Sequence, residues 1–129
     1  MKLSLKTAAV AAAIALSAAS AVADVKDYEF QLVQNEAKKG EATIAVRLLN
    51  KKTGKPVPDA VISAKRIDMA PDGMAEMTTK IEQLSSGEPG VYRFKANLSM
   101  EGRWQLSLGA KVQGETGTVE SKLVIKATP

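Results

Sequence analysis

The chain has 129 residues and a net charge of +4, and it contains neither cysteine nor histidine. Without histidine it lacks the commonest acid–base group and metal ligand, which excludes Ser-His, Cys-His and zinc-hydrolase sites. Without cysteine the fold must rest on its hydrophobic core rather than on disulfides. Basic residues are scattered among acidic ones and aromatic residues are few, so we expect no nucleic-acid binding.

The first 23 residues have the features of a secretory signal peptide. Lys2 and Lys6 precede an apolar, alanine-rich run at residues 8–16, and residues 21–23 have the small-x-small form of a cleavage site. The run is too short and too rich in alanine to span a bilayer comfortably. We therefore predict cleavage after Ala23, one exported domain at residues 24–129, and no stable membrane insertion.

Short segments of alternating hydrophobicity recur between turn signals in residues 24–129, which is typical of an all-β sandwich. The expected strands are residues 28–32, 42–48, 60–68, 78–84, 92–98, 104–108 and 119–125. Residues 35–41 and 50–59 are expected to form turns and loops, and the polar segment 78–84 is expected at a sheet edge. The pattern predicts an immunoglobulin-like antiparallel β-sandwich of about seven strands, although the Cys…Trp…Cys signature of antibody domains is missing.

Methionine is concentrated in the stretch RIDMAPDGMAEM, residues 66–77. Residues 70–73 (Ala-Pro-Asp-Gly) suit a type I turn, which would bring Met69 and Met74 to face one another across the reversal. Met77 shares a face with Met74 only if this piece is helical, and does not if it is extended.

Met100 is expected to join these three residues. If consecutive strands alternate in direction, the connections that follow the first, third and fifth strands emerge at one end of the sandwich. The methionine-rich stretch follows the third strand, and the turn that contains Met100 follows the fifth. The four thioethers are therefore expected at a single end.

A thioether is a soft, neutral ligand that needs no deprotonation, so a methionine cluster suits Cu(I) or Ag(I) better than Zn(II) or Cu(II). Packing is the competing interpretation, because methionine fills gaps in cores and also forms adaptable contact surfaces. Trp104 could cap such an ion through a cation–π contact, but it alternates in phase with Leu106 and Leu108, which favours the core. Calcium binding has weaker support, because the acidic residues of the stretch lack an EF-hand spacing. These acidic residues are Asp68, Asp72 and Glu76.

Two stretches, DMAPDGMAEM (68–77) and GVYRFKANLSMEGRWQLSL (90–108), resemble the YtkA-like and FixH-like domains, and GKPVPDAVI (54–62) is similar to the family's entry into its third strand. The usual pattern is a Met-rich loop, then Gly-x-Tyr, then Leu-x-Met-x-Gly-x-Trp. In this chain it is carried by Met69, Met74, Met77, Gly90, Tyr92, Leu98, Met100, Gly102 and Trp104.

This resemblance implies an immunoglobulin-like periplasmic domain of a kind often associated with copper handling or heavy-metal efflux. Membrane-anchored relatives serve cytochrome oxidase assembly. This chain departs from them because no membrane helix is expected after the signal peptide, and it departs from many copper carriers because it lacks histidine. The departures argue against the oxidase role and against Cu(II) as the cargo.

We therefore predict a soluble periplasmic protein that binds Cu(I) or Ag(I) through Met69, Met74 and Met77, with Met100 as an additional ligand. It would hand the ion to a metal-efflux pump or a cuproprotein. The alternative is a metal-free immunoglobulin-like interaction module that uses the same surface to contact a membrane or envelope partner. No nucleophile–base pair is visible, so we expect no enzymatic activity.

Overall fold

The computed structural model describes residues 25–129, and the predicted signal peptide lies outside the described residues. The strands are β1 (Tyr28–Leu32), β2 (Glu36–Lys38), β3 (Gly40–Asn50), β4 (Lys55–Pro56), β5 (Val61–Met69), β6 (Met74–Thr79), β7 (Ile81–Leu84), β8 (Val91–Leu98), β9 (Gly102–Lys111) and β10 (Val119–Thr128). Two short 3-10 turns accompany them, η1 (Val25–Asp27) and η2 (Ala70–Asp72). Across residues 25–129 no helix has the length and apolar character that a membrane crossing requires.

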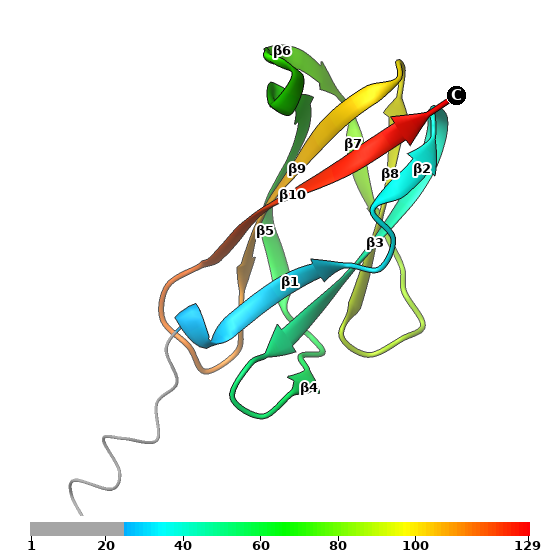
Figure 1. Cartoon of the computed structure of the whole chain (residues 1–129). Coiled ribbons are helices and arrows are strands. Elements are labelled where there is room, and N and C mark those ends of the chain that lie inside the picture. Colours follow the sequence, from blue (N-terminus) through cyan, green and yellow to red (C-terminus); the bar gives the residue numbers. More distant parts are fainter. Residues whose placement is uncertain (1–24) are drawn as a thin grey trace, which may run out of the picture.

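The strands form two sheets that enclose one core (Figure 1). The first sheet has the order β1-β3-β8-β7, with β4 paired to β3, and the second has the order β2-β10-β9-β5-β6. The pairing is antiparallel throughout except between β2 and β10, which run parallel. The first order matches strands A-B-E-D of an immunoglobulin domain, and β10-β9-β5 matches G-F-C. The predicted immunoglobulin-like sandwich is confirmed.

Two predicted turns contain short strands. Within residues 35–41, β2 pairs with the end of β10, so that Glu36 lies opposite Lys126. Within residues 50–59, β4 pairs with the end of β3, where Pro56 lies opposite Leu49. Segments of two or three residues are too short to show an alternating pattern, which is why their assignment as turns was wrong.

The predicted fourth strand, residues 78–84, proves to be parts of two strands. The chain leaves β6 in the second sheet, passes Lys80, and enters β7 in the first sheet. Both strands lie at the edges of their sheets, as the polar composition of the segment indicated. Residues 25–129 therefore contain ten strand segments rather than about seven.

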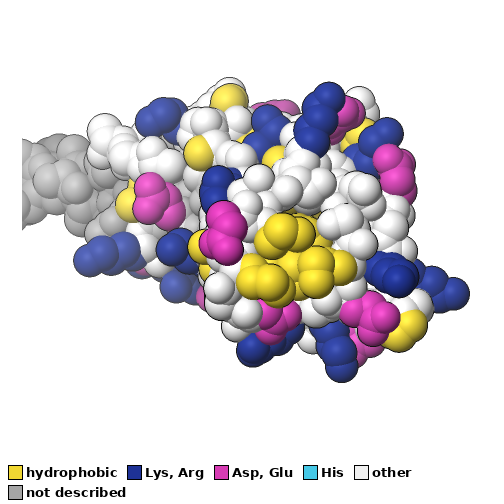
Figure 2. Space-filling view, turned by 90° about the horizontal axis from the view of Figure 1, so that it is seen from above, with side chains coloured by type: hydrophobic (Ala, Val, Ile, Leu, Met, Phe, Trp, Pro, Cys, Tyr) yellow, Lys and Arg dark blue, Asp and Glu magenta, His cyan; other side chains and the backbone are white. Residues whose placement is uncertain are grey.

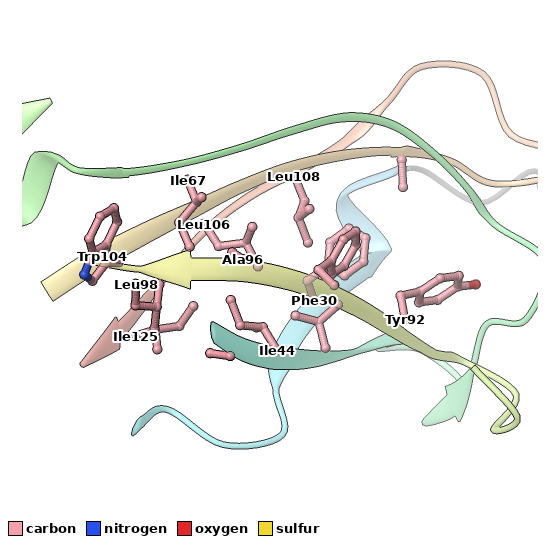
Figure 3. Packing of buried hydrophobic residues seen from close by; sticks show 14 of the residues in the cluster. Phe30, Ile44, Ile67, Tyr92, Ala96, Leu98, Trp104, Leu106, Leu108 and Ile125 are labelled. Carbon is pink, nitrogen blue, oxygen red and sulfur yellow. The ribbon is translucent and has the colours of Figure 1, made fainter. Parts of the chain in front are cut away.

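The core lies between the sheets and is built from alternate residues of the long strands. Ile44, Phe94 and Leu106 come from three of these strands and are almost completely buried. Trp104 lies at one end of this core and Tyr92 at the other (Figure 3). The Trp104 side chain is 0% exposed, and its Nε1 donates a hydrogen bond of 3.0 Å to the carbonyl oxygen of Met100. Trp104 is therefore a core residue, as its alternation with Leu106 and Leu108 indicated.

A candidate thioether site at one end of the sandwich

The methionine-rich stretch and the turn that holds Met100 lie at the same end of the sandwich (Figure 1). Residues 69–77 begin with the last residue of β5, and residues 99–101 connect β8 to β9. The two connections meet because β5 pairs with β9, with Asp68 opposite Gln105. We call residues 69–77 together with residues 99–103 the methionine end. The alternation of strand directions predicted this meeting correctly.

The predicted turn at residues 70–73 is present as η2. The amide of Gly73 donates to the carbonyl oxygen of Ala70 at 2.9 Å, and Gly73 has a φ of 78°. Glycine adopts this left-handed conformation without steric cost. The turn places Met74 opposite Met69 in the β5–β6 register, so the expected pairing of these two methionines is confirmed.

Met77 lies in an extended strand, not in a helical turn. In the register of β5 with β6, Asp68 pairs with Thr78 while Met69 pairs with Met74, so residues 75–77 form a bulge. In a regular strand, positions three apart point to opposite faces. The bulge interrupts that alternation, and the side chains of Met74 and Met77 are both half-buried against the core. Local sequence carried no signal for this bulge.

Arg66 and Asp68 form an ion pair that links the two strands of the methionine-rich stretch. Arg66 donates from Nε to Oδ2 of Asp68 at 2.8 Å and from Nη2 to the carbonyl oxygen of Ala75 at 2.9 Å. Oδ1 of Asp68 accepts a hydrogen bond from the amide of Ala70 at 2.9 Å. Both oxygens of the buried Asp68 carboxylate are therefore occupied, and the pair joins β5 to the bulge of β6.

A second pair fastens η2 to β9. Arg103 donates to Asp72 from its backbone amide at 2.7 Å and from Nε at 2.8 Å, and its Nη2 donates to the carbonyl oxygen of Pro71 at 2.8 Å. We call the Asp72–Arg103 pair and Gly102 beside it the latch. At Gly102 φ is 137°, and a Cβ atom there would lie 2.6 Å from both Oδ2 of Asp72 and Cε of Met69. A larger residue would be strained at this φ and would push the Asp72 carboxylate and the Met69 methyl group aside, so the latch depends on all three residues.

The hydrogen bonds from Arg103 lower the pKa of Asp72, first through the backbone amide and then through the side chain. A carboxyl with a depressed pKa stabilises the fold above its unfolded pKa, and this contribution disappears as the pH falls through the folded value. We expect the latch to be intact at neutral pH and to weaken only in acid.

In the Arg103→Gln variant the pKa of Asp72 should rise toward its ordinary value without reaching it, because the hydrogen bond from the backbone amide of residue 103 remains. An NMR titration of the Asp72 carboxyl carbon tests this, and an unchanged pKa in the variant would contradict it.

The four methionine side chains differ in their exposure. Met69 is 1% exposed and belongs to the core, Met74 and Met77 are half-buried, and Met100 is 38% exposed. Figure 2 views the molecule from above Figure 1 and shows hydrophobic side chains gathered near the middle of this end, with charged groups of both signs around them. The methionine end therefore presents an apolar surface and also contains one buried methionine, Met69.

The acidic residues of the stretch are unsuited to a hard cation. Within residues 25–129 no three or more aspartate, glutamate, histidine or cysteine side chains are grouped to hold a metal ion. Asp68 and Asp72 each form an ion pair with an arginine. Glu76 is exposed and belongs to no group of three potential metal ligands within residues 25–129. The weaker calcium interpretation therefore has no support from the geometry.

Residues 22–109 match the family model described as YtkA-like. The comparison with curated proteins gave no match. Among solved structures, the Lin-41 filamin domain is similar, with 18% sequence identity, a TM-score of 0.48, and coverage of 79% of this chain and 92% of that chain. Because the family model covers more than half of the sequence, this chain belongs to the YtkA-like family.

Proposed function

We propose that this protein is an exported, periplasmic carrier that binds Cu(I) or Ag(I) through the thioethers of Met69, Met74, Met77 and Met100. It would deliver the ion to a metal-efflux pump or a cuproprotein. The observation that supports this proposal is that all four methionines of residues 25–129 lie at one end of a chain that has no histidine or cysteine.

The chemistry of the available donors favours a soft ion. Thioether sulfur binds Cu(I) and Ag(I) in preference to harder divalent ions. The two carboxylates within the fold at this end are neutralised by Arg66 and Arg103, so they offer little to a hard cation. Thioethers, unlike free thiols, cannot be lost as disulfides in an oxidising compartment.

The exposures suggest different roles for the four ligands. Met74, Met77 and Met100 are accessible, so an arriving ion would meet them first. Met69 is buried beside Gly102, and it would supply the inner side of the site. The ion would thus sit at the boundary between the core and solvent, where a partner protein could reach it.

The direct test is anaerobic competition between the purified domain and a colorimetric Cu(I) chelator. We expect the wild type to withdraw Cu(I) from the chelator, with an affinity that is nearly constant between mildly acidic and neutral pH. Thioethers do not titrate, whereas metal binding by histidine or cysteine releases protons and changes with pH. A wild-type domain that fails to compete would exclude the carrier function.

The proposed export has a separate test. The mature protein should begin at Asp24, because alanines at positions 21 and 23 fit the small subsites of a signal peptidase. Intact-protein mass spectrometry of material from the exporting compartment gives the mature N-terminus. Retention of residues 1–23 would contradict periplasmic release.

The second candidate function is a metal-free interaction module. The apolar patch on the methionine end favours it, because contiguous exposed apolar surface marks many protein-contact sites and methionine adapts to varied partners (Figure 2). This function predicts that the wild type fails the Cu(I) competition. It also predicts that the wild type binds a protein partner from the cell envelope in a pull-down and that the Met100→Lys variant does not. Unchanged capture by the Met100→Lys variant would exclude it.

A further inference from the structure

The methionine end has two levels of thioether. The outer level consists of Met74, Met77 and Met100, which solvent reaches to different extents, and Met100 is the most exposed of the four at 38%. The inner level is Met69, which is 1% exposed. Dissolved molecules can therefore reach the outer side chains in the folded state, whereas they reach Met69 only after a local opening.

The latch lies directly beside the end of the Met69 side chain. The methyl group of Met69 and the carboxylate of Asp72 occupy the space where Gly102 lacks a side chain. Arg103 holds Asp72 in that position with two hydrogen bonds and holds Pro71 with a third. The turn η2, which directly follows Met69, is therefore fastened to β9, and release of this turn requires the three hydrogen bonds to break.

We propose that the outer thioethers, led by Met100, are a methionine-oxidation site for peroxide or hypochlorous acid, and that the latch protects Met69 from the same reaction. A sulfur lone pair attacks the terminal oxygen of hydrogen peroxide, the O–O bond breaks, and a sulfoxide and water form. Sulfur loses two electrons and the peroxide gains them. With hypochlorous acid the products are the sulfoxide, chloride and a proton.

Oxidation changes what this surface can do. A sulfoxide is polar and a strong hydrogen-bond acceptor, whereas the thioether is apolar and soft. The backbone of the turn should remain in place, because Trp104 binds the Met100 carbonyl oxygen and not its side chain. The modification would therefore alter the surface of the methionine end without unfolding the domain. It needs no metal, so it does not depend on the proposed carrier function.

The test is a time course with hydrogen peroxide on the metal-free folded protein, followed by trypsin digestion and mass spectrometry. Cleavage after Lys95 and Arg103 gives a peptide with Met100, and cleavage after Arg66 and Lys80 gives one with the other three, whose sulfoxides fragmentation distinguishes. We expect Met100 to react first, Met74 and Met77 next, and Met69 last. The rate at Met69 should be at least about tenfold lower than at Met100, because its reaction waits for local opening.

Variants separate the latch from general stability. Arg103→Gln and Asp72→Asn should each raise the Met69 rate severalfold while the circular dichroism spectrum stays native. Arg93→Gln is the matched control. Arg93 forms an ion pair with Glu88 at 3.6 Å, and this pair lies outside the methionine end, so the substitution should leave all four oxidation rates unchanged. The proposal fails if Met69 in the folded wild type reacts as fast as Met100, or if the four rates equal those in urea. The protective role of the latch is refuted if Arg103→Gln and Arg93→Gln change the oxidation rate of Met69 by the same factor.

Discussion

Replacing Trp104 with alanine is expected to lower the free energy of unfolding by about 3–5 kcal/mol. Trp104 is the largest fully buried side chain of the core, and its removal leaves a cavity that the two rigid sheets cannot close. The substitution also removes the Nε1 donor that binds the Met100 carbonyl oxygen. Urea denaturation followed by circular dichroism measures the change, since the variant lacks the tryptophan needed for a fluorescence signal.

Trp104→Phe is the matched control for this prediction. Phenylalanine keeps an aromatic ring in the core but lacks the indole N–H, so it should cost clearly less than alanine. A loss well under about 1 kcal/mol in Trp104→Ala would show that Trp104 contributes little to the core. A cation–π contact with a bound ion would then explain the presence of Trp104 better than core packing does.

Replacing Met69, Met74 and Met77 together with leucine is expected to abolish Cu(I) binding while the domain remains folded. Leucine is close to methionine in volume and hydrophobicity, so each swap should cost under about 1.5 kcal/mol. The triple variant therefore removes three of the four proposed thioether ligands and keeps most of the packing. The measurement is the anaerobic chelator competition, with circular dichroism as the folding control.

The burial of Met69 makes a second variant necessary. Met74→Leu with Met77→Leu leaves the core residue in place, so a loss of Cu(I) there cannot be attributed to repacking around Met69. Met100→Leu should weaken binding further if that turn completes the site. Equal Cu(I) retention by the wild type and the triple variant would refute the thioether site.

The sequence predicted those features whose cause is local. Alternating apolar residues in β3, β8 and β9 predicted three long strands, because a strand with one buried face must alternate. The Ala-Pro-Asp-Gly order predicted the turn of η2 from the conformations that proline and glycine prefer. The position of the Met100 turn at the same end as residues 69–77 also followed from the sequence, since it needs only strands that alternate in direction.

The tertiary structure decided the features that depend on partners distant in the chain. The pairing of β2 with β10, the bulge in β6 and the latch between Asp72 and Arg103 have no periodic signal in the sequence. Asp72 and Arg103 are 31 positions apart, and nothing local indicates that they meet. The sequence also did not show that Met69 is buried while the other three methionines are more exposed. Burial depends on which segments pack over a residue, and that packing is set by the whole fold rather than by the neighbours of the residue in sequence.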